Sequence, residues 1–416
     1  MLRTALLLAG ALSLPLAQDA EPYLKDSDLK KLAGALSDYI EASIAQQKVL
    51  EAESDVQEQM DKLGKKLRKA PVRDVLGSPA DLGRALWLSY EYGKARVKGG
   101  SVEDKDAIQG PFTKSNPLKY TMLAPAGYDK GKSKSWPLIL CIPDEGESPR
   151  EHLLQNWEDS GLRDQVILAC PEMPAESADW LGTPGVATAL ILFRTIYEEW
   201  AIDFDEVYLA GRGAGVEAAL SIAGKFPERF AGVIGRSGDA GSADPANFSN
   251  VATWFAGGGA GVTAWAEKIE ELEFNNCTVS ADGREPEILA WMDGVSRPSV
   301  PEKVVLVPGR PFPTRSYWIQ VEAGDEEGAR VEATVDRASN TITIEADVVP
   351  RVTVLFNDDL VDLSKPVKVI VNGVENEDQL PRSFRTCLSL IFRGTSDPGR
   401  VFVASRTYSV PARAAK

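Results

Sequence analysis

The chain has 416 residues and a formal net charge of −15, with 46 Lys and Arg, 61 Asp and Glu and a single His. This acidic balance argues against binding to nucleic acid or to an anionic membrane surface, because both need basic patches. One His also excludes a zinc site with three His ligands. The apolar fraction of 44% is enough for sizeable cores, and the length predicts about two or three domains.

The first residues, 1–17, carry one Arg followed by an apolar run, MLRTALLLAGALSLPLA. This pattern is typical of a secretory signal peptide, with Ala17 as the last residue before cleavage. A buried or membrane-anchoring N-terminus is the alternative. Because no later segment reaches the ~18 apolar residues of a membrane span, we expect the mature protein to be soluble and secreted or periplasmic.

Residues 18–100 are expected to form a helical N-terminal region. Apolar residues recur at steps of three and four, which places them on one helix face: Leu29, Leu32, Leu36, Ile40 and Ile44, then Val56, Met60, Leu63 and Leu67. These helices are expected either to pack on the body of the protein or to form a coiled-coil contact, which would produce an oligomer. A further apolar helix is expected over 82–92. The Gly-rich, charged segment 98–111 is expected to be a linker.

The segment 112–300 alternates between apolar strands and helices. Strands are expected at 118–125, 137–143, 164–171, 206–211, 231–238, 251–259 and 275–281. Helices are expected from 152 onward and at 185–200, 214–226, 265–274 and 285–292. This alternation predicts a doubly wound α/β domain, in which a parallel sheet is covered on both faces.

The segment 315–412 has a period of two, which is typical of half-buried strands. Strands are expected at 317–323, 329–336, 341–346, 351–357, 368–373 and 401–410, with a short helix within 379–392. We expect a β-rich, sandwich-like C-terminal domain.

The most informative stretch is Gly211-Arg212-Gly213-Ala214-Gly215, which joins a predicted strand to a predicted helix. A strand, a sharp Gly-X-X-X-Gly turn and a helix of small residues form the nucleophile elbow of α/β-hydrolases. YTMLAPAGYD, WPLILCIP and KFPERFAGVIGRSG match other pieces of that superfamily in consistent order over about residues 115–295. The chain resembles its secreted esterases, those related to poly(hydroxybutyrate) depolymerases and dienelactone hydrolases. The resemblance implies an α/β-hydrolase fold and ester hydrolysis by a Ser-His-acid triad.

The chain departs from that pattern at the nucleophile, the oxyanion hole and the base. Gly213 stands in the place of the nucleophilic Ser, and a glycine has no nucleophile to offer. Pro143-Asp144 replaces the His-Gly of the oxyanion hole, where an acidic side chain disfavours a developing oxyanion. Arg284-Glu285 occupies the region of the base His.

The triad acid is also missing after the strand at 251–259, although Asp239 and Asp244 lie in a nearby loop. The one remaining His, His152, is expected to be an ordinary residue near a helix start, with a relocated base as the alternative. Enzymes stripped of a triad still accelerate the reaction ~10³–10⁴-fold over the uncatalysed rate. Loss of one oxyanion-hole donor lowers kcat by a further factor of ~10²–10³. Triad-type hydrolysis should therefore be close to absent.

The elbow can still present backbone N–H groups at a helix N-terminus, beside an arginine, and such a turn can hold an anion. The candidate ligand-binding residues are therefore Arg212, Gly213, Ala214, Asp144 and Glu145. The alternative is that the glycines simply permit the turn. No cofactor or metal is expected, since the acidic runs at 325–327 and 358–359 suit solvated turns better than a calcium site.

Three functions remain open. The first is an exported, non-catalytic α/β-hydrolase-fold protein that binds an as yet unknown ligand, polymer or protein partner. The second is an esterase-like hydrolase that uses unconventional residues of the same cleft, among Asp144, Glu145, Arg212, Arg284 and Glu285. The third is a structural or assembly protein of the cell envelope. The four cysteines, Cys141, Cys170, Cys277 and Cys387, are expected to be buried free thiols, although export permits a disulfide.

Overall fold

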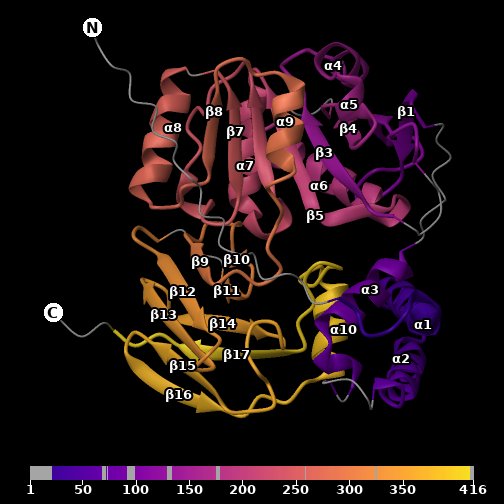
Figure 1. The fold of residues 1–416 in the computed structure, drawn as a ribbon, viewed down its shortest axis with the longest axis vertical. Helices are drawn as coiled ribbons and strands as arrows, with labels where there is room; N and C mark the ends of the chain where they lie inside the picture. Colours follow the sequence, from indigo (N-terminus) through magenta and orange to yellow (C-terminus); the bar gives the residue numbers. More distant parts are fainter. Residues whose placement is uncertain are drawn as a thin grey trace, which may run out of the picture.

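The computed structural model describes residues 21–67, 72, 74–90, 99–128, 134–174, 179–257, 259–322, 324 and 326–412. It has three parts: N-terminal helices, a central α/β domain and a C-terminal β-rich domain (Figure 1). The expected signal peptide, residues 1–17, lies outside the described residues.

The central domain is built on an eight-stranded sheet with the order β1-β2-β4-β3-β5-β6-β7-β8. Its strands are β1 (Val102–Ala107), β2 (Leu118–Leu123), β3 (Trp136–Ile142), β4 (Ile167–Pro171), β5 (Ile202–Arg212), β6 (Gly232–Arg236), β7 (Ala252–Ala256) and β8 (Cys277–Ser280). The pairs from β4 to β8 are parallel, whereas β2 is antiparallel to both β1 and β4. The predicted doubly wound α/β fold is confirmed.

Helices cover both faces of this sheet, because neighbouring residues of each buried strand point to opposite sides. Leu140 of β3 belongs to the buried cluster that includes residues of α6, α7 and α8, while Cys141 belongs to the cluster that includes residues of α4, α5 and α9. The helices are α4 (Pro149–Asn156), α5 (Ser160–Arg163), α6 (Thr183–Glu199), α7 (Gly215–Lys225), α8 (Ala260–Glu271) and α9 (Glu285–Met292), with short turns η3 (Pro227–Arg229) and η4 (Pro245–Asn247).

The linker prediction for 98–111 is wrong for its central part. Val102–Ala107 forms the edge strand β1, which pairs with β2. Its sequence, VEDKDA, buries only Ala107. An edge strand can face water on both sides, so it lacks the apolar alternation that identifies strands in a sequence.

The β-rich domain contains two sheets, with the orders β10-β11-β14-β17 and β16-β15-β13-β12-β9. Their strands are β9 (Lys303–Leu306), β10 (Arg315–Ser316), β11 (Ile319–Val321), β12 (Arg330–Asp336), β13 (Thr341–Asp347), β14 (Arg351–Phe356), β15 (Val367–Val371), β16 (Val374–Asp378) and β17 (Ala404–Ser409). All pairs are antiparallel except β13–β15. The predicted helix is α10 (Phe384–Phe392). Three strands, β9, β10 and β16, were not predicted: β9 and β10 are runs of four and two residues before the first expected strand, and β16 is polar apart from the exposed Val374.

The N-terminal helices are α1 (Asp26–Ala45), α2 (Val49–Gly64) and α3 (Pro79–Ser89), with a short turn η2 (Val75–Gly77) before α3. Helix α1 packs on both α2 and α3. Its predicted apolar face is buried from Leu29 to Leu36. An ion pair of 2.8 Å joins Glu53 of α2 to Arg385 at the start of α10. The helices therefore pack on the body of the protein, which was one of the two alternatives.

A loop of the C-terminal domain joins all three parts. Its Pro398 lies against α3, where a Cβ added to Gly83 would be 2.2 Å from the Pro398 carbonyl oxygen. Its Asp397 Oδ1 accepts a 2.7 Å hydrogen bond from Nη2 of Arg297, which also donates to Asp205 Oδ1 of β5 at 2.8 Å. Burial would raise the pKa of Asp397, but the charge and hydrogen bonds of Arg297 lower it to about 2.

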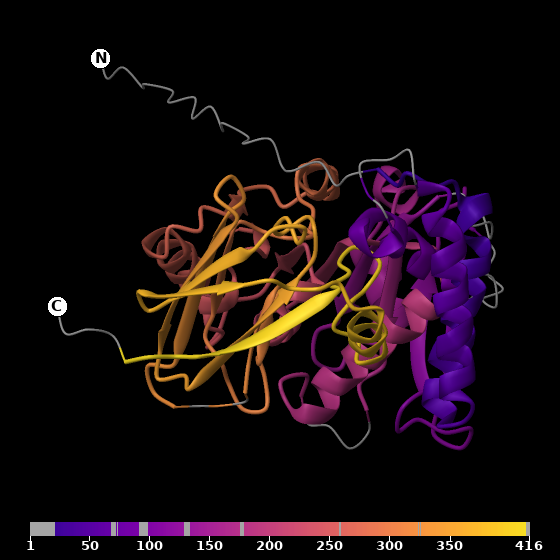
Figure 2. The same cartoon turned by 90° about the horizontal axis from the view of Figure 1, so that it is seen from below.

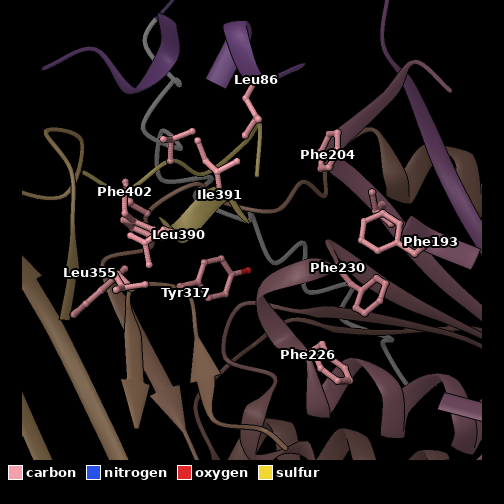
Figure 3. Packing of buried hydrophobic residues seen from close by; sticks show 14 of the residues in the cluster. Leu86, Phe193, Phe204, Phe226, Phe230, Tyr317, Leu355, Leu390, Ile391 and Phe402 are labelled. Carbon is pink, nitrogen blue, oxygen red and sulfur yellow. The ribbon is translucent and has the colours of Figure 1, made fainter. Parts of the chain in front are cut away.

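Apolar side chains from the three parts belong to one continuous core (Figure 3). Leu86 comes from α3, Phe204 from β5, and Ile391 and Phe402 from the β-rich domain. A 90° turn of the molecule shows α10 set between the β-rich sheets and the N-terminal helices (Figure 2).

Gly83→Ala and Gly34→Ala should have opposite effects on the free energy of unfolding. Both glycines lie inside helices, where alanine is favoured by about 0.5–1 kcal/mol. A Cβ at Gly34 meets nothing within 4 Å, so this variant should gain stability. At Gly83 the new methyl would push against backbone of the Pro398 loop, and we expect a loss of about 1–3 kcal/mol. Urea unfolding measures both, and a Gly83→Ala variant at least as stable as wild type would contradict the proposed junction.

Candidate functional site

The elbow between β5 and α7 has the strand–turn–helix geometry that its sequence predicts. Gly213 has a φ of +53°, which glycine adopts at little cost. The turn is too tight for side chains at its flanks: a Cβ would lie 2.2 Å from the Gly215 carbonyl oxygen at Gly211, and 2.3 Å from the Ile142 carbonyl oxygen at Gly215. The helix thus begins directly against the end of β3.

The carboxylate of Asp144 fills the space above Gly213. A Cβ at Gly213 would lie 2.1 Å from Oδ2 of Asp144. Oδ1 of Asp144 accepts hydrogen bonds from the backbone N–H of Ala214 at 3.0 Å and of Glu145 at 2.9 Å. In α/β-hydrolases the oxyanion hole takes its donors from these two places, the residue after the nucleophile and the loop after the β3 strand. In this chain both of these backbone N–H groups donate to the carboxylate of Asp144.

Glu147 fixes the loop that carries Asp144. Its Oε2 accepts from the Asp144 backbone N–H at 3.1 Å and from Nδ1 of His152 at 2.8 Å, and its Oε1 accepts from Nδ2 of Asn156 at 2.7 Å. Nη1 of Arg212 lies 3.7 Å from the same Oε1. Burial would raise the pKa of Glu147, but these hydrogen bonds outweigh it and lower the pKa below its ordinary value. Glu147 is therefore an anion that organises the loop.

His152 is buried beside Glu147, with 2% of its side chain exposed. Nε2 of its ring accepts from Nε1 of Trp157 at 3.4 Å, and Nδ1 donates to Glu147. Burial lowers the pKa of His152, although the Glu147 carboxylate opposes this shift. The ring is therefore neutral near pH 7, and both nitrogens have partners. His152 lies in α4, near its start as expected.

Four of the five predicted ligand-binding residues converge at the elbow: Asp144, Arg212, Gly213 and Ala214 are linked by the contacts above. The side chain of Arg212 is 39% exposed. Glu145 contributes its backbone N–H, while the residue as a whole is exposed. Pro143 is buried at the end of β3.

Of the degenerate base region, Arg284 does not join this cluster, and Glu285 reaches it only through Arg236. Oε1 and Oε2 of Glu285 accept the backbone N–H groups of Glu158 and Asp159, at 3.0 and 2.8 Å. Arg284 is 68% exposed and pairs with its neighbour Glu287 at 2.9 Å. Asp239, considered for the triad acid, accepts the Gly261 N–H at the start of α8.

Sequence reasoning missed Glu147 and the residues around it. The members of this group gather around the buried His152, with Trp157 buried and the others partly buried: Glu147, Asn156, Trp157 and Arg236. Arg236 lies over the Trp157 ring at 5.1 Å and pairs with Glu285 at 3.8 Å. The sequence signal was only a carboxylate five residues before the single His, which has no fixed meaning at that spacing.

The described part of the chain contains potential metal ligands and four thiols. No group of three or more His, Cys, Asp or Glu side chains is placed there to hold a metal ion. Asp358 of the second acidic run instead pairs with Arg382, while Asp325 of the first lies outside the described residues. All four cysteines are unpaired, and Cys277 is the one that is not fully buried. None of the helices described here has the length and apolarity that a membrane crossing requires.

No family model matches the chain, and no curated protein matches it in sequence. About half of the chain is similar in structure to esterases of the α/β-hydrolase fold. A thermostable esterase is 14% identical with a TM-score of 0.38, over 45% of this chain and 61% of that one. S-formylglutathione hydrolase from Staphylococcus aureus is 9% identical with a TM-score of 0.36, over 46% of this chain and 98% of that one. A CE1 ferulic acid esterase from Anaeromyces mucronatus is 13% identical with a TM-score of 0.36, over 48% of this chain and 91% of that one. At such identities the similarity concerns the fold alone.

Gly213→Ala should be destabilising mainly because of Asp144. The new methyl would overlap the carboxylate, and the positive φ adds about 1 kcal/mol for any residue with a Cβ. Gly257→Ala is the matched control, because Gly257 has a φ of +79° and a Cβ there would meet nothing within 4 Å. In an Asp144→Ala background the cost of Gly213→Ala should fall by at least about 1 kcal/mol. Equal costs in both backgrounds, measured by chemical unfolding, would refute the contact.

His152→Gln should change the pH dependence of stability. Because the folded pKa of His152 lies below its ordinary value of 6.5, the folded state binds its proton less readily than the unfolded state. The stability that His152 contributes is then fully present above pH 6.5 and is lost as the pH falls through the folded pKa. The stability difference between wild type and His152→Gln should shrink from about pH 7 to about pH 5. A stability difference that grows as the pH falls from about 7 to about 5 would show that folding raises the pKa of His152.

Proposed function

We propose that this protein is an exported protein of α/β-hydrolase fold that does not hydrolyse esters and acts by binding a ligand, polymer or protein partner. The observation that carries the proposal is the Asp144 carboxylate above Gly213, hydrogen-bonded to both N–H groups of the oxyanion position. The signal-peptide pattern of residues 1–17 supports export.

The filled oxyanion position bears directly on catalysis. Acyl transfer is accelerated by donors that stabilise charge developing on the carbonyl oxygen. At this elbow the donors of Ala214 and Glu145 are already bound to a carboxylate. An ester oxygen would have to displace that anion and then develop its own negative charge next to it. With glycine at the nucleophile position, no covalent intermediate forms at residue 213 either.

The same geometry disfavours an enzyme of unconventional chemistry at the elbow. Acid–base catalysis by two carboxylates needs environments that push their pKa values apart, so that one remains protonated near neutral pH. Here the hydrogen bonds to Glu147 lower its pKa, and Glu285 is used by two backbone N–H groups. These carboxylates serve as hydrogen-bond acceptors that hold loops.

Turnover of short and medium acyl esters by the purified protein tests the proposal. Wild type, Asp144→Asn and the double variant Asp144→Gly/Gly213→Ser should all match the buffer rate, since the double variant restores a hydroxyl but has no base beside it. Asp144→Asn keeps the shape of the side chain and removes its charge. Wild-type turnover that survives repurification would contradict the proposal, and its loss in Asp144→Asn would locate the chemistry at the elbow.

A further inference from the structure

Strand β17 lies at the edge of its sheet and pairs with β14 alone. In an antiparallel pair, alternate residues direct their backbone groups to the same neighbour. The Val410 N–H donates to the Pro350 carbonyl, so Val410 and the alternate residues before it face β14. The Leu355 N–H of β14 donates to the Trp318 carbonyl beside β11, so Leu355 faces β11 and not β17. In the observed register, Arg406 and Tyr408 therefore bond to β14.

The backbone groups of the alternate residues, Ser405, Thr407 and Ser409, consequently point to the free edge. All three residues are exposed. Their backbone N–H groups have no hydrogen bond to another residue of the described chain beyond the β14 ladder. Such a row of unpaired donors and acceptors is a template for a further strand.

A groove of about 470 Å³ runs beside this edge, between β17 and β16. The side chains of β17 that face it are tied to β16: the Tyr408 hydroxyl donates to Asp378 at 2.9 Å, and Nη2 of Arg406 lies 3.5 Å from the same carboxylate. Glu377 adds an exposed acidic group to the β16 wall. The groove thus offers an aromatic ring, a cation and carboxylates to whatever strand pairs with β17.

We propose that the free edge of β17 binds β17 of a second copy of this chain, antiparallel and centred on Thr407, which gives a two-fold symmetric dimer. This register sets Ser405 opposite Ser409 and Thr407 opposite itself, so that the hydroxyl side chains share one face. On the groove face it sets Arg406 of each copy opposite Tyr408 of the other. The Arg406 guanidinium of one copy then contacts the Tyr408 ring of the other copy and the Asp378 carboxylate to which that Tyr408 is hydrogen-bonded.

This charge pattern is what favours a second copy as the occupant. Every Arg406 faces an aromatic ring with an acidic wall behind it, and no two like charges lie directly opposite each other. A two-fold axis repeats each contact, as self-complementary dimer interfaces do. The interface lies away from the N-terminal helices, and the apolar face of α1 is buried within the chain from Leu29 to Leu36. It is independent of the function proposed for the elbow.

Sedimentation equilibrium of the purified protein, with Thr407→Pro and Thr407→Val as a matched pair, tests this interface. Both variants remove the 2.8 Å contact between the Thr407 and Thr353 hydroxyls, but Thr407→Pro alone removes the N–H that points to the free edge. Proline is tolerated at such an edge position. Wild type and Thr407→Val should dimerise alike, and Thr407→Pro should weaken the dimer by roughly 10- to 100-fold, because two hydrogen bonds are lost at the axis.

Arg406→Glu provides a second variant that does not alter the backbone, in case Thr407→Pro fails to fold by circular dichroism. It sets a carboxylate against Tyr408 and Asp378 of the other copy and should also weaken the dimer. A monomeric wild type overturns the proposal, as does a dimer unaffected by Thr407→Pro and Arg406→Glu. A dimer that is lost instead in Ile44→Glu, at an exposed position of α1, places the interface on the helices and equally overturns it.

Discussion

The space above Gly213 can hold a side chain at residue 213 or the carboxylate of Asp144, but it cannot hold both. The 2.1 Å separation between a Cβ at Gly213 and the Asp144 carboxylate states this exclusion directly. Glycine at the turn and an acidic residue after β3 are therefore two parts of one arrangement. The turn between β5 and α7 keeps its tight geometry, while the space above it is filled by a carboxylate of the same chain.

Two further layers hold Asp144 in place. Glu147 accepts the Asp144 N–H and is itself held by His152 and Asn156. The single His thus belongs to the support of the loop. Burial lowers the pKa of His152, whereas burial would raise that of Glu147 and its hydrogen bonds lower it. The N-terminus of α7 provides a favourable field for the Asp144 carboxylate, and Arg212 lies beside Glu147. A buried network whose members all have partners rigidifies the loop.

The sequence predicted much of the fold and the position of the elbow, but not how the elbow is filled. Apolar runs identified the buried strands, and the glycine spacing identified the turn, because both are local properties. The edge strand β1 was not predicted, because its sequence VEDKDA buries only one residue and so lacks an apolar pattern. Asp144 was recognised as a departure from the hydrolase pattern, but the direction of its side chain depends on the conformation of the loop between β3 and α4, which the sequence does not predict. The pairing of Glu147 with His152 likewise depends on that loop, since no helical or strand period relates the two residues.

Hydrogen exchange of the Ala214 and Glu145 amide protons, measured by NMR in wild type and Asp144→Ala, tests the filled elbow most directly. Both residues are exposed, so protection of their N–H groups depends on the Asp144 carboxylate. The Gly213 N–H, which donates to the Arg236 carbonyl at 3.2 Å, serves as the internal control. The filled elbow predicts faster exchange at Ala214 and Glu145 in Asp144→Ala, with Gly213 unchanged. Equal exchange of the Ala214 and Glu145 amides in both proteins would show that the Asp144 carboxylate does not accept these two hydrogen bonds.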